Sequence, residues 1–277
     1  MTLYLNEKLN WNFIGNSDLL NKLSKAMSLA DLKSPNKIFL FKKKDDIHEI
    51  PKKYFDFKLG WNLQDNLSSR YLTHEILKDI IISLKPENDY MGFKNMFFPV
   101  WHQVIKEGGL PLHCALLEKN GKGLLFIAPN SGGKSTISNL ASSPWEVRSD
   151  DMNIIIDRKA FPLPTWSYFT HKSHLSSRRT WDTLRPSPVM EVFFLEKSKE
   201  DRVGGMTNGE AVMRIVSSVT EINEQDFKYM DLVRLRTLRR LIFDNAWNLA
   251  KITPCHILKF NKEGNPWEKI EEVMQNV

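Results

Sequence analysis

The residues best suited to chemistry in this sequence follow one short apolar run. After Leu124-Leu125-Phe126-Ile127 the chain continues as Ala128-Pro129-Asn130-Ser131-Gly132-Gly133-Lys134-Ser135-Thr136. This stretch matches a relaxed phosphate-loop pattern, in which an Ala or Gly is followed after four residues by Gly-Lys and then by Ser or Thr. Small residues and glycines let the backbone wrap closely around a phosphate chain, so that successive N–H groups point at it. The sequence therefore predicts a phosphate-binding loop between a strand and a helix.

The residues of this loop have different expected roles. Lys134 is expected to reach the terminal phosphates of a nucleotide, and the Ser135 hydroxyl to ligate Mg²⁺. A helix that begins at about Gly133 would add the positive end of its dipole and its unpaired N–H donors. Ala128 stands where glycine is usual, which the pattern tolerates although it makes the start of the loop less permissive. The predicted nucleotide-binding residues are Asn130, Ser131, Gly132, Gly133, Lys134, Ser135 and Thr136.

Two adjacent acids downstream are candidates for the rest of the chemistry. Phosphoryl transfer needs a metal ligand and a carboxylate that takes the proton of the attacking hydroxyl. Asp150 and Asp151 lie at a predicted strand edge, where two neighbouring carboxylates repel each other and favour a cation or a shared proton. An Asp-Asp pair is also common in surface turns, so both interpretations are open. The preceding Val147-Arg148-Ser149 is not the long apolar strand of a standard Walker B motif, which argues against the common ATPase classes.

The bulk composition excludes several classes of protein. Of the 277 residues, 42% are hydrophobic and 26% charged, and no apolar stretch approaches the length of a membrane span. The net charge of +6 suits a protein that handles anions, but no basic block is interleaved with aromatic residues as nucleic-acid stacking requires. Residues 1–7 lack the basic and apolar regions of a signal peptide, and Cys114 and Cys255 lie in apolar segments. We therefore expect a cytoplasmic protein with reduced core thiols that binds neither nucleic acid nor membranes.

The pattern of apolar residues predicts two modules, 1–105 and 106–277. The first is expected to be a smaller, mixed α+β module without a catalytic signature. Its predicted elements are helices over 17–32, 74–84 and 97–105 and a strand over 38–41.

The second module is predicted to be α/β. A hairpin over 112–117 and 124–128, turning at Asn120-Gly121, leads straight into the loop, whereas in ordinary nucleotide-binding proteins the strand arrives from a helical crossover. Thr207 and Glu210 form a predicted capping box for a helix. The other predicted elements are strands over 152–156, 191–195 and 256–260, a basic helix over 225–250, a helix from Pro266 and a flexible loop, a candidate lid, over 201–208.

Some further residues admit both a functional and a structural interpretation. A basic segment with His171, His174, Arg178 and Arg179 is either a grip for phosphates or an acidic peptide, or a solvated loop. Trp166 and Trp181 either line a groove or pack in the core. The arginines Arg234, Arg236, Arg239 and Arg240 fit the solvent face of an amphipathic helix, and the alternative is that one of them reaches the phosphates.

Several of these motifs together resemble a known family. Leu112-His113, Asn120-Gly121-Lys122-Gly123, the loop from Asn130 to Ser135 and Asp150-Asp151 are similar to the core of HPr kinase/phosphorylase, whose fold relates to phosphoenolpyruvate carboxykinase. The closer resemblance is to HPr-kinase-like proteins of peptide-modification clusters, such as the kinases that phosphorylate lasso peptides. The segments 108–113, 144–145 and 162–167 look like the P-loop member of SynChlorMet-type radical-SAM cassettes. The resemblance covers 108–277 well and the first hundred residues loosely.

The resemblance implies a role for each matching residue. Lys134 would bind the β- and γ-phosphates, Ser135 and Asp150 would hold Mg²⁺, and Asp151 would be the general base. His113 matches a family histidine that would orient the phosphates or the acids, although a structural histidine on a strand is equally consistent with its position. The glycine-rich, Glu-containing signature of true HPr kinases is replaced here by 161–166. That departure removes one metal ligand and argues against the phosphorylase half-reaction and against HPr as the substrate.

These observations lead to one expected function and two alternatives. The expected function is Mg²⁺-dependent transfer of the γ-phosphoryl group of ATP to a Ser or Thr hydroxyl of a peptide or small protein, such as a ribosomally made precursor, with modifying enzymes as partners. The resemblance also allows a homo-oligomer, since HPr-kinase relatives often form one. The first alternative is a nucleotide-binding partner protein that performs no transfer. The second is a kinase of a small alcohol.

Overall fold

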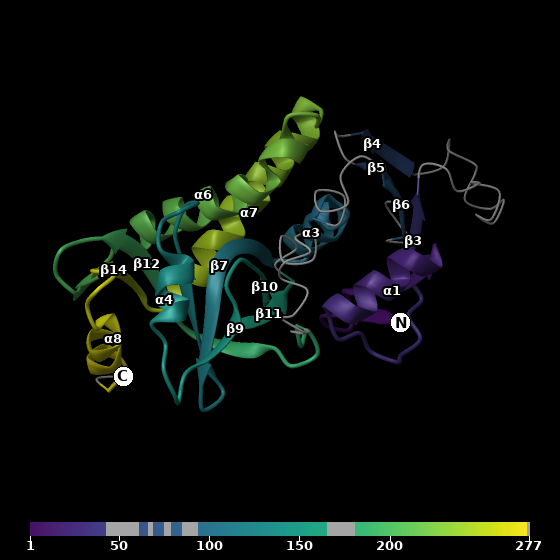
Figure 1. Ribbon diagram of the computed structural model, residues 1–277. Helices are drawn as coiled ribbons and strands as arrows, with labels where there is room; N and C mark the ends of the chain where they lie inside the picture. The colour runs from purple at the N-terminus through teal and green to yellow at the C-terminus, as the bar shows by residue number, and fades with distance from the viewer. Residues whose placement is uncertain (43–60, 66–68, 75–78, 85–93, 165–180, 276–277) are drawn as a thin grey trace.

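Two β-sheets and the helices around them make up the part of the chain that the structure describes (Figure 1). The structure is a computed structural model, and it describes residues 1–42, 61–65, 69–74, 79–84, 94–164 and 181–275. Its mixture of parallel and antiparallel strands with packed helices confirms the predicted α/β class. In the described residues, no helix has both the length and the hydropathy needed to cross a membrane.

The N-terminal sheet has six strands in the described residues, in the order β1-β2-β3-β6-β5-β4. Strands β2, β3 and β6 run parallel to one another, and the other neighbours are antiparallel. Helix α1 begins after Asn16, whose side chain accepts the N–H of Leu19, and buries Leu19 and Leu23. The elements are β1 (Thr2–Tyr4), β2 (Asn10–Gly15), α1 (Ser17–Ala26), β3 (Lys37–Lys42), β4 (Trp61–Asp65), β5 (Ser69–His74) and β6 (Ile80–Leu84).

The second sheet has eight strands in the described residues and carries the predicted loop. Its main order is β11-β10-β7-β8-β12-β14-β13, with β9 beside β7. Strands β8, β12 and β14 are parallel to one another, and β7 pairs antiparallel with β8, β9 and β10. The strands are β7 (Leu110–Lys119), β8 (Lys122–Ile127), β9 (Glu146–Ser149), β10 (Met152–Ile156), β11 (Lys159–Leu163), β12 (Ser187–Lys197), β13 (Arg202–Gly205) and β14 (Cys255–Phe260).

Helices cover both faces of the second sheet. Because side chains alternate along a strand, Val192 and Phe194 of β12 join the core under α6 and α7, whereas Phe193 joins the core under α4 and α8. Figure 1 shows α6 and α7 as a long pair that extends beyond the sheet, and α8 apart from them near the C-terminus. The helices are α3 (Phe98–Lys106), α4 (Lys134–Asn139), α6 (Asn208–Phe227), α7 (Leu232–Ile252) and α8 (Pro266–Gln275).

One hydrophobic cluster joins residues from both sides of the predicted boundary at 105/106. Trp11 and Trp101 pack in the same cluster as Met152, Ile154 and Phe161 of the second sheet. Helix α3 also contacts β7, β10 and α7. The two predicted modules therefore share a core, while the boundary itself stays a prediction.

Many predicted elements are confirmed. The hairpin turns at Asn120 and Gly121, both with positive φ, and the capping box of Thr207 and Glu210 is present. The predicted helix over 97–105 is α3, and the helix from Pro266 is α8. The predicted strands correspond to β3, β7, β8, β10, β12 and β14.

Four predicted elements are wrong in whole or in part. The predicted helix over 74–84 is wrong, because β5 ends at His74 and Ile80–Leu84 forms β6. The predicted loop over 201–208 contains the strand β13, which pairs with β14. The helix predicted over 17–32 ends at Ala26, since Met27 is extended and bridges to Trp181. The single helix predicted over 225–250 covers the end of α6 and most of α7, because α6 ends at Phe227 and Asp231 caps the start of α7.

Both cysteines are free thiols. Burial raises the pKa of Cys114 to about 12 and that of Cys255 to about 11, so neither thiol ionises readily at neutral pH. This agrees with the predicted core thiols.

Candidate functional site

The predicted phosphate loop lies between the end of β8 at Ile127 and the start of α4 at Lys134. The Gly132 N–H donates to the Pro129 carbonyl over 2.9 Å, and Ser131 has a φ of 60°. Asn130, Ser131 and Ser135 are exposed, so the outer side of the loop is open to solvent. Thr136 is half-buried in the first turn of α4, a helix of six residues.

Close packing explains why two glycines stand in this loop. Gly133 has a φ of 109°, in the left-handed region, and a Cβ there would lie 2.7 Å from the Phe260 ring. A Cβ on Gly132 would lie 2.7 Å from the Ala128 Cβ and 2.8 Å from the Pro129 oxygen. The loop conformation therefore requires glycine at both positions.

Lys134 is buried beneath the loop, with 7% of the residue exposed. Its Nζ donates to the carbonyl oxygens of Ala128 at 2.7 Å and Pro129 at 3.1 Å. Burial lowers the pKa of Lys134, and the negative charges of Glu221 and Asp151 oppose that shift. The ammonium group thus connects the first two residues of the loop to the start of α4. It is also attracted by the nearby carboxylates of Glu221 and Asp151.

The pairing of β7 with β10 brings Asp151 to His113. Asp150 and Asp151 form the turn between β9 and β10, and Met152 stands opposite His113 in the antiparallel register. The His113 Nε2 lies 3.2 Å from Asp151 Oδ1, with 8% of the histidine side chain and 31% of the aspartate side chain exposed. The two predicted catalytic residues are therefore neighbours, and the acid has access to solvent.

A second carboxylate, that of Glu221 on α6, contacts the other side of the His113 ring. Glu221 Oε2 lies 3.0 Å from His113 Nδ1, and Glu221 Oε1 accepts the N–H of Asn130 over 3.0 Å. The Ser218 hydroxyl, one turn earlier on α6, accepts the N–H of His113 over 3.0 Å. Successive polar contacts therefore connect Asp151, His113, Glu221 and Asn130.

Sequence reasoning missed Glu221, and only a weak signal for it exists. A single glutamate on a helix matches no motif, and its partners lie far away along the chain. Ser218 and Glu221, however, border the apolar positions Ile215, Val219 and Ile222 that α6 turns towards the sheet. Glu221 lies next to this buried stripe, three residues after Ser218. A polar side chain at such a position can form a contact with the sheet.

The structure brings most, but not all, of the predicted site residues together. The loop residues, Lys134, His113 and Asp151 adjoin one another, and Asp150 precedes Asp151 in the same turn. Among the described residues, no group of three or more His, Cys, Asp or Glu side chains could hold a metal ion. Serine and aspartate oxygens are nevertheless ligand types that Mg²⁺ accepts, and this ion commonly takes its other ligands from phosphates and water.

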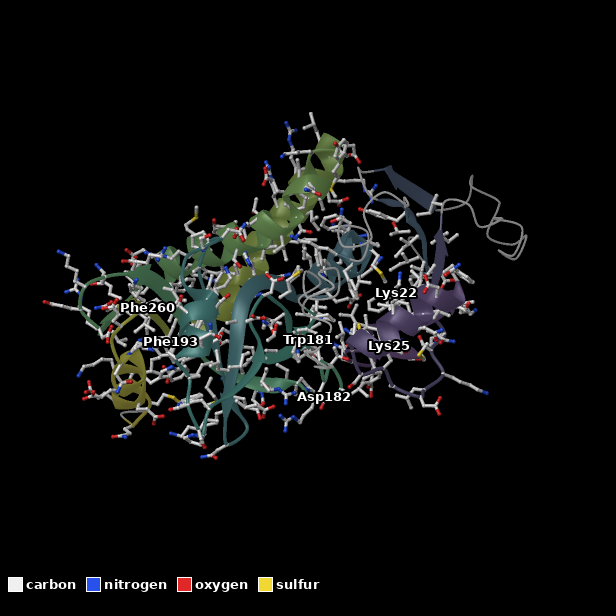
Figure 2. All side chains as sticks on the ribbon, viewed as in Figure 1. Lys22, Lys25, Trp181, Asp182, Phe193 and Phe260 are labelled. Atoms are coloured by element: carbon white, nitrogen blue, oxygen red, sulfur yellow. The ribbon has the colours of Figure 1, made fainter. Side chains whose placement is uncertain are left out.

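The structure describes only some of the other residues for which the sequence allows a functional role. Trp181 is 3% exposed, and its backbone N–H donates to the carbonyl of Ala26 at the end of α1, so it is a buried residue beside α1 rather than the lining of a groove (Figure 2). Arg236, Arg239 and Arg240 are exposed on α7, as predicted for a solvent face, whereas Arg234 is half-buried and lies near Asp231. Trp166, the histidines at 171 and 174 and the arginines at 178 and 179 lie outside the described residues.

Fold and site together define an α/β protein in which a glycine loop joins a strand to a helix beside a histidine flanked by two carboxylates. The family model for SynChlorMet cassette protein ScmC matches residues 79–275, a range that contains the whole site. The chain belongs to this family, which confirms the predicted resemblance to the SynChlorMet cassette member. A search among curated proteins gave no match.

Proposed function

We propose that the protein is a Mg²⁺-dependent P-loop kinase with an HPr-kinase-like fold. It would transfer the γ-phosphoryl group of ATP to a Ser or Thr hydroxyl of a peptide or small protein. The observation that carries the proposal is the contact of 3.2 Å between His113 and Asp151 beside the loop. A general base near a phosphate cradle is the arrangement that phosphoryl transfer to a hydroxyl requires.

In this proposal the loop and Lys134 hold the nucleotide. The N–H groups at the start of α4 would face the phosphates, and Lys134 would exchange its two carbonyl acceptors for phosphate oxygens. Ser135 and Asp150 would hold Mg²⁺, which supplies neutralisation of phosphate charge. The fit is one of ligand chemistry, since both residues offer oxygen donors next to the loop.

Asp151 would take the proton of the substrate hydroxyl. As the substrate oxygen bonds to the γ-phosphorus, the bond from that phosphorus to the β–γ bridging oxygen breaks and ADP leaves with the electron pair. His113 would orient the Asp151 carboxylate through Nε2. The partial exposure of Asp151 leaves room for an acceptor side chain to approach it.

Family membership supports a peptide as the acceptor. The family is named for a cassette, and the resemblance predicted from the sequence relates that cassette to peptide modification. A precursor peptide would then be the substrate, and the modifying enzymes of the cassette would be partners. The hairpin that runs directly into the loop supports the HPr-kinase-like fold over an ordinary doubly wound one.

A second candidate function is a nucleotide-binding partner protein without transfer chemistry. The inward position of Lys134, whose ammonium group is already bonded to two carbonyls, favours it. A lysine that keeps these bonds would bind the loop rather than a γ-phosphate. The two functions differ in whether Asp151 is needed.

The test is intact mass spectrometry of a candidate precursor peptide after incubation with the protein and Mg-ATP. We expect a gain of one phosphoryl mass with the wild type and none with Asp151→Asn. Calorimetric titration with ATP should give similar binding for both proteins. Binding of ATP without any mass gain in the wild type would reject this peptide as the acceptor, in favour of the partner protein or of a kinase with another acceptor. Mass gain with Asp151→Asn would reject Asp151 as the base.

A further inference from the structure

Glu221 connects two parts of the site that lie on different elements. One of its oxygens accepts the N–H of Asn130 in the loop, and the other lies 3.0 Å from His113 Nδ1. The opposite nitrogen of the same ring faces Asp151. A continuous set of polar contacts therefore runs from the loop backbone through α6 and β7 to the proposed base.

The fold of α6 does not depend on this carboxylate. The helix is held by the fully buried Ala211, Ile215 and Val219 and by its capping box, whereas 26% of the Glu221 side chain is exposed. Removing it leaves the apolar face of the helix intact. Glu221 is therefore placed for orientation rather than for stability.

The charge of Glu221 is also wrong for a residue that binds phosphate. Its carboxylate takes one loop N–H that an anion would otherwise use, and it adds negative charge beside the cradle. A residue that served binding would carry the opposite charge. Its presence is explained if it fixes the His113 ring and the start of the loop relative to each other.

We infer that Glu221 is a positioning residue, which holds His113, and through it Asp151, in register with the phosphate loop. The inference rests on the proposed function, because it names the group that aligns the base with the transferred phosphoryl. A displacement of about 1 Å between reacting groups can cost on the order of 10²-fold in rate. Loss of Glu221 should therefore reduce kcat and leave the KM for ATP unchanged or lower.

The test compares Glu221→Ala and Glu221→Gln with a matched control, Glu224→Ala. Glu224 lies one turn further on α6, where it pairs with Lys228 on the surface. We expect a fall in kcat on the order of 10- to 100-fold for Glu221→Ala, with an unchanged or lower KM for ATP and an unchanged melting temperature. Glu221→Gln should recover most of the rate, since its amide can accept from Asn130 and donate to His113. Glu224→Ala should behave as the wild type.

A spectroscopic measurement separates this inference from the proposed function. The ring nitrogens of His113 are observed by long-range ¹H–¹⁵N NMR in the wild type and in Glu221→Ala. We expect the Nδ1 resonance to move in the variant, whether or not the wild type transfers a phosphoryl group. An unmoved resonance, an unchanged kcat in Glu221→Ala or an equal loss in Glu224→Ala would overturn the inference. If the resonance moves in Glu221→Ala but the wild type has no transferase activity, the proposed function is rejected and, with it, the role of Glu221 in aligning a base.

Discussion

Two residues of the loop region, Lys134 and Gly133, make contacts that the sequence pattern does not describe. Lys134 bonds to Ala128 and Pro129, and Gly133 lies against the ring of Phe260, which ends β14. Contact with Phe260 of β14, as well as the loop's own glycines, therefore determines the conformation of the loop. At this scale the pattern predicts which residues form the loop, and the tertiary contacts explain why each has its size.

Replacing Gly133 with alanine should distort the loop and abolish nucleotide binding. The new Cβ would meet the Phe260 ring at 2.7 Å, and the φ of 109° is strained for any residue with a side chain. The measurement is calorimetric titration with ATP. Gly209→Ala is the matched control, because a Cβ there meets nothing within 4 Å, and it should bind as the wild type. Unimpaired binding by Gly133→Ala would show that the loop adopts another conformation in solution.

At the scale of elements, a buried polar cluster fixes the far end of α6. The Tyr71 hydroxyl of β5 donates to both carboxylate oxygens of Asp226, at 3.0 and 2.8 Å, and His102 Nε2 of α3 lies 3.1 Å from Asp226. All three side chains are buried, and burial together with the Asp226 charge raises the pKa of Tyr71 well above its usual value. The cluster ties the N-terminal sheet to the helix that also carries Glu221.

Tyr71→Phe should lower the free energy of unfolding by about 1.5–3 kcal/mol, the usual contribution of a hydrogen bond to a charged group. The ring is kept, so the change removes only the hydroxyl from a carboxylate that water cannot reach. Urea unfolding followed by circular dichroism measures the difference. Tyr229→Phe, at an exposed tyrosine, should have no measurable effect. A loss of similar size in both variants would contradict the role of the cluster.

The elements also show where sequence reasoning succeeds and where it fails. The hairpin, the loop and the capping box were predictable because each rests on contacts between residues close in sequence. The strand β6 was predicted as a helix, because its apolar positions fit a helical period, although its run of β-branched isoleucines favours a strand and β3 and β5 pair with it on both sides. Glu221 and Asp226 were missed for the same reason, since their partners come from other elements.

At the scale of the whole molecule, carboxylates hold helices to both faces of the second sheet. On one face Glu196 of β12 pairs with Arg214 of α6, and on the other Glu271 of α8 bonds to Lys119 of β7 and to the Trp145 indole. The hydrogen bond from Arg214 lowers the pKa of Glu196, and the one from Lys119 lowers the pKa of Glu271. The layers on either side of the sheet are thus joined by groups that acid can neutralise.

The pKa of Glu271 sets the direction of the last prediction, because its folded value lies below the ordinary value of 4.5. The pair therefore stabilises the protein fully above that ordinary value, and the contribution is lost as the pH falls through the lowered folded value. Glu271→Gln should reduce the urea midpoint at pH 7, where the carboxylate is charged, and should reduce it by less as the pH falls below 4.5, because the contribution of the charge is lost as the carboxylate becomes protonated. Glu268→Gln, an exposed change in the first turn of the same helix, should lower the midpoint by less than Glu271→Gln at pH 7, since it removes only an interaction with the helix dipole. Parallel curves for wild type and Glu271→Gln over this range would mean that the carboxylate does not attach α8 to the sheet by its charge.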